Sequence, residues 1–386
     1  MQKEKKITIS AAQLFVMLFI SRTIVNITYS LYIAEISEMW DNLVSAVVSF
    51  FLTLLMVIPV YLLYKRSPSH SILDQGCSAW GKLGTAVAVI YALYFIWVLC
   101  YTLSLFDLFV TDLMNPKISA AVLSLGVIAA SVYGAYKGIE ALGRTSGLVL
   151  VAILAAFIFL VCALTAQVDP LNYKPFFYEG AGGTINGVLL MLARNSCIPA
   201  LAILLPFAKG NVKKGIGWWC AGIYGSTILV ILLVVGVLGD YLVTQPFPVY
   251  TATSVAQIGI FQRMDAVFLG VWTAGIFIKC ALFLYLVSLC VKKIWGEKAS
   301  RISILVTGAV VLLMTYGITA SNAVMGVLFN NNILLAFTML TAVVLPLLVL
   351  LSRKTRGNTH EKVSCTGSFH TRSGFLYRLY RGKAAE

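Results

Sequence analysis

Long apolar runs dominate the chain, and short connections rich in Lys, Arg, Gly, Pro and Asn separate them. A helix that crosses the hydrocarbon core of a bilayer needs about 20 apolar residues at a rise of ~1.5 Å each. Ten runs reach about this length, at roughly 9–31, 42–64, 84–111, 118–136, 146–166, 183–207, 216–238, 264–291, 302–320 and 332–351. The pattern predicts an all-α polytopic membrane protein with ten transmembrane helices.

Two of these runs carry polar residues at mid-depth. The first contains Ser21, Arg22, Thr23 and Asn26, and the sixth contains Arg194, Asn195 and Ser196 followed by Pro199. Non-helical backbone within a bilayer is tolerated only where protein encloses it. Interrupted helices at the start of each half are typical of transporters built from inverted repeats. We therefore expect a 5+5 inverted repeat with discontinuous helices 1 and 6.

The spacing of the intramembrane charges agrees with such a repeat. Arg22 and Arg194 lie 172 residues apart, and the same offset carries Asp107 in the third run onto Lys279 in the eighth. An odd number of spans in each half inverts the second half relative to the first. The sequence thus predicts one ten-helix membrane domain over residues 1–351, with repeats at about 9–166 and 183–351, and a basic cytoplasmic tail over 352–386.

Composition also points to lipid as the solvent. The chain is 60% apolar and 11% charged, with a mean hydropathy of +0.90, whereas soluble domains have about 25% charged residues. This excludes a soluble enzyme, a nucleic-acid-binding module and a disordered scaffold. Neither a Walker-type loop nor an HExxH or GxSxG motif occurs, and the eight cysteines form no CxxC pair. We expect no catalysis, no metal site and no cofactor.

The net charge of +14 is distributed asymmetrically along the chain. If the N-terminus is cytoplasmic, the predicted outer loops hold only Lys117, Lys174 and Arg263 of the 29 Lys and Arg residues, and nearly all the others fall in inner loops and the tail. This bias orients membrane proteins with the basic side in the cytoplasm. It predicts that both termini are cytoplasmic, with the lipid bilayer rather than a nucleic acid as the partner of the basic residues.

Charged residues within the spans are the candidate ligand-binding groups, because intramembrane charges usually mark ligand or ion pathways. The candidates are Ser21, Arg22, Thr23, Asn26, Asp107, Arg194, Asn195, Ser196 and Lys279. Two alternatives remain open: the charges pair with one another structurally, and Asp107 reaches interfacial water at the end of its span. Two arginines near one cavity favour a ligand with a carboxylate. Lys279 at mid-depth would repel a metal ion, which predicts sodium-independent binding.

Several motifs resemble a known family. The run Phe261–Trp272 contains R-x-D-x-x-F-x-x-x-W, residues 136–144 read YKGIEALGR, residues 175–180 read PFFYEG, and Leu205-Pro206 precedes Lys209, Lys213 and Lys214. Over about residues 1–355 the chain resembles spore germinant-receptor B subunits, the GerAB-type spore germination permeases of the amino-acid–polyamine–organocation transporter superfamily. Helix 1 departs from the family pattern, because it lacks a glycine-containing break.

The resemblance implies a subunit in the spore inner membrane that binds a small germinant, such as an amino acid, beside an A subunit and a C-subunit lipoprotein. The alternatives are a functional amino-acid secondary transporter, with or without proton coupling, and a scaffold that only seats its partners. Ligand binding without flux would indicate the receptor, and uptake would indicate the transporter. The absence of both would indicate the scaffold. The sequence does not identify the germinant.

Overall fold

The computed structural model describes residues 8–28, 39–111, 120–174, 181–245, 247–258, 261–262, 265–319 and 321–352. The main helices are α1 (Ala11–Thr28), α3 (Met39–Arg66), α5 (Thr85–Phe109), α6 (Ala120–Lys137), α7 (Ile139–Thr165), α8 (Ala181–Ala193), α9 (Cys197–Leu204), α10 (Val212–Leu238), α12 (Asp265–Trp295), α13 (Glu297–Thr319), α15 (Asn331–Met339) and α16 (Leu345–Leu351). Short helices lie between them, namely α4 (Ile72–Trp80), α11 (Pro248–Val255) and α14 (Asn322–Leu328).

Smaller elements complete the connections. The 3-10 turns are η1 (Gly81–Gly84), η3 (Pro170–Tyr173), η4 (Leu205–Phe207) and η5 (Gly239–Thr244), and the strands are β1 (Ile9–Ser10), β2 (Ala208–Lys209), β3 (Gln257–Ile258) and β4 (Phe261–Gln262). Strands β1 and β2 pair in parallel, and β3 and β4 pair antiparallel. The β1–β2 pair ties the start of α1 to the chain that leaves α9.

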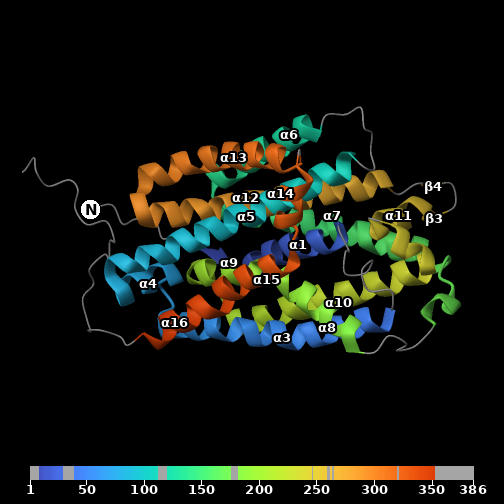
Figure 1. Cartoon of the computed structure of the whole chain (residues 1–386), viewed down its shortest axis with the longest axis horizontal. Coiled ribbons are helices and arrows are strands. Elements are labelled where there is room, and N and C mark those ends of the chain that lie inside the picture. Colours follow the sequence, from blue (N-terminus) through green and yellow to red (C-terminus); the bar gives the residue numbers. More distant parts are fainter. Residues whose placement is uncertain are drawn as a thin grey trace, which may run out of the picture.

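The long helices run roughly along one axis of the molecule, as in a bundle that crosses a membrane (Figure 1). One end carries α4, and the other carries α11 with β3 and β4. Helices α1 and α9 lie in the middle, and α1 packs on α7, α10 and α12. The centre of the bundle is therefore formed by α1 and by the region where α8 gives way to α9.

Length and apolar composition identify the membrane-crossing helices. Within the described residues, eight helical segments are long and apolar enough to cross a bilayer, and two shorter apolar helices cover Ala11–Ile24 and Ala121–Lys137. Each of the ten predicted runs overlaps one of these segments. The chain is a multi-pass membrane protein.

The predicted interruption of helix 1 is wrong. Helix α1 continues through Ser21, Arg22 and Thr23 to Thr28. The Ser21 hydroxyl donates to the Met17 carbonyl oxygen at 2.7 Å, within the helix, and the segment contains neither Gly nor Pro. Because a polar side chain can be satisfied without unwinding the backbone, mid-depth polarity alone does not break a helix.

The last span contains an irregularity that the sequence does not predict. A π-helical segment, Leu340–Val344, joins α15 to α16, and Pro346 lies in the first turn of α16. The π-helical segment leaves the Thr341 carbonyl oxygen accessible to the Tyr91 hydroxyl, which donates to it at 2.6 Å. This bond connects the last span to α5 in the interior of the bundle.

Close packing of α1 against α10 generates a first prediction. A Cβ atom on Gly215 of α10 would lie 2.2 Å from the Phe15 ring of α1, whereas a Cβ on Gly217 would have no neighbour within 4 Å. We expect Gly215→Ala to destabilise the protein by about 1–3 kcal/mol through overpacking and Gly217→Ala to be nearly neutral. The thermal midpoint of each detergent-solubilised variant measures the difference. Equal midpoints would contradict the packing described for α1.

Candidate ligand site at the interrupted helix

The sixth span is interrupted, as predicted. Helix α8 ends at Ala193, the turn Arg194–Ser196 follows, and α9 begins at Cys197. Pro199 has no N–H to donate to the carbonyl oxygen of Asn195, four residues earlier, and that oxygen accepts instead from the Ile198 N–H at 3.1 Å. The turn is buried in the bundle. Unpaired backbone groups at such a depth need partners, since lipid offers none.

Arg22 provides one of these partners. Its Nη2 donates to the Met191 carbonyl oxygen at 2.9 Å, in the last turn of α8, and its Nε donates to Asn195 Oδ1 at 3.0 Å. Arg22 is 1% exposed. A cation at the C-terminal end of a helix is also favoured by the helix dipole. The guanidinium of α1 therefore caps α8.

A second cap comes from the last span. The Thr338 hydroxyl donates to the Ala193 carbonyl oxygen at 2.9 Å, and the Tyr94 hydroxyl lies 3.0 Å from Thr338 Oγ1. All three residues are buried. The end of α8 is thus held by side chains of α1 and α15, with α5 behind α15.

Asn195 extends the network to two more helices. Its Nδ2 donates to Thr53 Oγ1 of α3 at 2.8 Å and lies 3.4 Å from the Tyr224 hydroxyl of α10. The hydroxyl oxygens of Thr53 and Tyr224 are 2.6 Å apart and share a hydrogen bond. One amide side chain in the turn thereby joins α3, α10 and, through Arg22, α1. A displacement of the turn would therefore change its hydrogen bonds with all three helices.

Positive charge gathers on the other side of the turn. Lys279 of α12 is 3% exposed and lies close enough to Arg22 and Cys197 to interact with them electrostatically. Its Nζ lies 5.7 Å from the centre of the Phe283 ring. Within the described part of the chain, no carboxylate or hydrogen-bond acceptor pairs with this ammonium. The positive N-terminal end of α9 adds to the same region.

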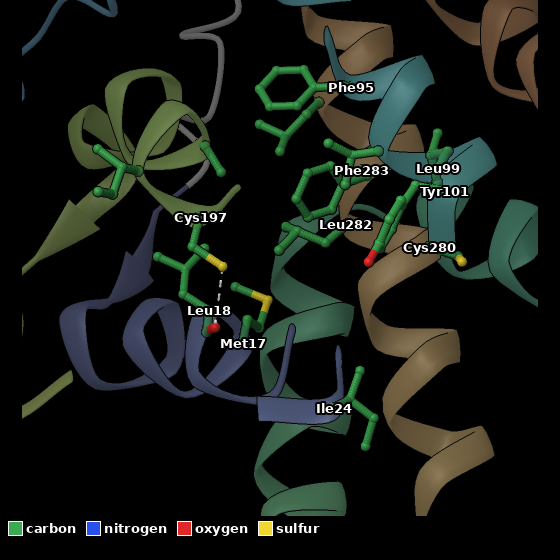
Figure 2. Close-up of a cluster of buried hydrophobic side chains, with 14 of the residues drawn as sticks. Met17, Leu18, Ile24, Phe95, Leu99, Tyr101, Cys197, Cys280, Leu282 and Phe283 are labelled. Carbon is green, nitrogen blue, oxygen red and sulfur yellow. Dashed lines mark hydrogen bonds between the residues drawn. The ribbon is translucent and has the colours of Figure 1, made fainter. Parts of the chain in front are cut away.

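Figure 2 shows a cluster of buried apolar side chains that includes Cys197, the first residue of α9. The Cys197 thiol donates to the Leu18 carbonyl oxygen at 3.4 Å, and Met17 and Leu18 lie opposite Leu282 and Phe283. Apolar walls exclude water and strengthen electrostatic interactions within the site.

The structure brings some of the predicted residues together and separates others. Arg22, Arg194, Asn195, Ser196 and Lys279 are buried around the turn. Ser196 is the N-cap residue of α9 and makes no side-chain cap bond. Ser21 is satisfied within its own helix. Thr23 lies on the same turn of α1 and is buried, and its hydroxyl has no partner among the described residues. The side chain of Asn26 lies outside the described residues.

Asp107 does not belong to this cluster. Its carboxylate accepts a hydrogen bond from the Ser124 hydroxyl of α6 and is mostly buried, so it does not simply reach interfacial water. Its neighbour Phe106 stacks on Trp272, which precedes Lys279 by seven residues, or about 10 Å along α12. The Asp107–Lys279 correspondence in the sequence does not bring the two charges together.

Several residues of the site escaped the sequence analysis. Thr53 and Tyr224 complete the Asn195 network, and Thr338, which pairs with the Tyr94 hydroxyl, caps α8. Hydroxyl-bearing residues are common in membrane helices, so none of them is distinctive alone. A signal did exist in α3, where Asp41, Ser45, Ser49 and Thr53 recur every four residues and are all buried. This spacing defines one polar face of a helix.

Comparison with solved structures identifies the fold. The chain aligns with a TM-score of 0.59 to a Na⁺-coupled sialic acid symporter in its substrate-bound outward-open state, at 13% identity, covering 88% of this chain and 80% of the symporter. The fold is therefore that of a membrane transporter. A comparison with curated proteins finds no match.

The family assignment is more specific. A family model described as spore germination protein matches residues 8–324, which is most of the chain. The protein belongs to the spore germination protein family, a family of permeases and not of enzymes. The resemblance of the sequence to spore germination permeases is confirmed.

The capping of α8 generates a second prediction. Thr338→Val keeps the shape of the side chain but removes the donor to Ala193 and the partner of Tyr94, leaving buried polar groups unpaired. We expect a destabilisation of about 1–3 kcal/mol, measured as a lower thermal midpoint in detergent. Thr319→Val is the matched control, because Thr319 bonds only within its own helix. A midpoint equal to that of the control would show that the cap is dispensable.

Proposed function

We propose that the protein is a membrane subunit of a spore germinant receptor, which binds a small germinant, most simply an amino acid, and helps to trigger germination. The observation that carries this proposal is the buried Lys279 ammonium, which has no acceptor among the described residues, beside the interrupted helix α8–α9. Family membership supports the link to germination. The symporter of the same fold binds a substrate, which supports a ligand site in this architecture.

The proposal includes ten spans in a 5+5 inverted repeat. Packing within the bundle supports it, because contacts of one half recur in the other when the halves are exchanged. Helix α1 packs on α10 as α8 packs on α3, α1 packs on α7 as α8 packs on α15, and α5 packs on α13 as α12 packs on α6. An exchange of spans 1–5 with spans 6–10 maps each of these pairs onto its counterpart.

The proposal also includes a sidedness, with both termini cytoplasmic and the protein in the spore inner membrane. Lys65 and Arg66 lie in the last turn of α3, and Lys292 and Lys293 lie in the last turn of α12, where Lys293 pairs with Asp74 of α4 at 2.7 Å. Trp218 and Trp295 are 79% and 70% exposed, as expected of anchors at a membrane interface. We place the A subunit and the C-subunit lipoprotein as partners in this membrane.

The charge of the site favours an anionic group on the germinant. Arg22 and Lys279 bring two positive charges into a water-poor interior, and the N-terminus of α9 adds a partial positive charge. A buried charge is costly unless it is paired. Because Arg22 is engaged by Met191 and Asn195, we assign the carboxylate of the germinant chiefly to Lys279, with Arg194 beside the site.

A third prediction tests binding and ligand charge together. The experiment measures binding of the twenty amino acids to the purified protein in nanodiscs, with and without the A and C subunits. Lys279→Met should weaken binding of the preferred amino acid tenfold to a hundredfold, since a charge-assisted contact contributes about 1.5–3 kcal/mol, and it should spare the corresponding amide or ester. Arg194→Gln should also weaken binding of the amino acid more than binding of its amide. Arg22→Gln should weaken binding of the amino acid with less discrimination between acid and amide.

The exposed Lys292, on the same helix as Lys279, provides a control, and Lys292→Met should leave affinity unchanged. Equal losses of affinity for the amino acid and for its amide would show that these cations have a structural role and do not bind the carboxylate. Uptake of the ligand into proteoliposomes would favour the secondary transporter, which the fold of the symporter supports as a second candidate. If the protein shows neither binding nor uptake of any amino acid, the scaffold is the remaining alternative and the proposal is overturned.

A fourth prediction concerns sodium. A sodium ion bound to α12 near α1 would need oxygen ligands, but the Lys279 ammonium occupies this part of α12 and repels a second cation. We expect germinant affinity to be the same in sodium and in potassium at constant ionic strength. A strong increase of affinity in sodium would contradict this role of Lys279.

A further inference from the structure

The short helix α4 joins several spans at one end of the bundle. It contacts α5, α9, α12 and α16 (Figure 1). Gln75 holds α4 to the end of α3, because its Nε2 donates to the carbonyl oxygens of Leu63 at 3.2 Å and of His70 at 3.1 Å. A Cβ on Gly84 would lie 2.3 Å from the Gly76 carbonyl oxygen, so α4 also packs closely on the chain that enters α5.

Asp74 fixes the position of α4 through both of its carboxylate oxygens. Its Oδ2 accepts from the Ser71 N–H at 3.1 Å and from the Ser71 hydroxyl at 2.9 Å, and Ser71 Oγ accepts from the Asp74 N–H. This reciprocal capping box satisfies the first turn of α4. The other oxygen, Oδ1, accepts from the Lys293 ammonium of α12 at 2.7 Å. The same carboxylate therefore starts α4 and ties it to α12.

Burial distinguishes this ion pair from a neighbouring one. The side chains of Lys293 and Asp74 are 14% and 36% exposed, whereas those of Lys292 and Glu297, which also pair, are 51% and 56% exposed. Exposed ion pairs contribute little to stability, but the loss of one partner of a buried pair is costly. We therefore expect the Lys293–Asp74 pair, and not its exposed neighbour, to hold α4 against α12.

Helix α12 connects this ion pair to the proposed ligand site. Lys279 and Lys293 are separated by fourteen residues of the same helix, or about 21 Å along its axis. Rigid secondary-structure elements carry coupling between distant sites. An anion that draws Lys279 toward the turn between α8 and α9 would therefore also displace Lys293.

We propose that the Lys293–Asp74 pair is a latch that keeps this end of the bundle closed under α4, and that germinant binding at Lys279 releases it. The proposed sidedness places the latch on the cytoplasmic side, so its release would open the interior of the bundle to the cytoplasm. The release rests on the proposed germinant binding, whereas the closure rests on the ion pair alone.

Cys290 of α12 reports whether the latch is closed. It lies one turn before Lys293 and is fully buried, so a thiol reagent should reach it only when this end of the bundle opens. The full-length protein in nanodiscs is treated with a maleimide, and mass spectrometry identifies the cysteines that are labelled. Cys220 of α10 is also buried, and its labelling would reveal general unfolding.

Variants of the latch test the closure without any ligand. Lys293→Met and Asp74→Asn should each label Cys290 about tenfold faster than the wild type, because each leaves one charge of a partly buried pair without its partner. Lys293→Arg keeps the charge and should stay protected, and the matched control Lys292→Met should label as slowly as the wild type. Wild-type rates in Lys293→Met and Asp74→Asn, or equally fast labelling of Cys220, would overturn the latch.

Amino acids test the release. A mixture of the twenty amino acids should accelerate labelling of Cys290 in the wild type severalfold, and Lys279→Met should abolish this acceleration. Binding of an amino acid without faster labelling would overturn the release and leave the germinant site intact. Failure of every amino acid to bind would overturn the proposed function and with it the release, whereas the variants would still decide the closure.

Discussion

The carbonyl groups exposed where α8 ends are the constraint on which the rest of the site depends. A helix end in the interior of a membrane has no water to satisfy its last carbonyl groups. Arg22 and Thr338 satisfy the carbonyls of Met191 and Ala193 from two other helices. The interruption is therefore possible only where α1 and α15 meet α8, and this requirement fixes the centre of the bundle.

The same constraint shapes the electrostatics of the interior. Using a guanidinium as a cap places a permanent charge at mid-depth, and Lys279 adds another from α12. Asn195 distributes the contacts of Arg22 to α3 and α10 through Thr53 and Tyr224. An anion at Lys279 would interact with the turn that these helices share. Unequal affinity for two arrangements of the turn is all that a germination signal requires.

The sequence predicts the spans well because length and apolarity are properties of a single segment. It predicts the interruption near Arg194 because Pro199 removes a particular donor. It fails at Arg22, whose partners lie about 170 residues away, in α8 and in the turn that follows it, so local polarity suggested unwinding where the helix continues. The Thr338 cap is also a tertiary feature, and no pattern within one span predicts it.

A double-mutant cycle between Arg22 and Asn195 tests the central claim most directly. Unfolding of wild type, Arg22→Met, Asn195→Leu and the double variant is measured in the same detergent. If the guanidinium holds the turn through Asn195, the double variant should lose less stability than the sum of the two single variants, with a coupling of about 1–3 kcal/mol. Additive losses would show that the two side chains act independently, and would contradict the claim that Arg22 holds the turn through Asn195.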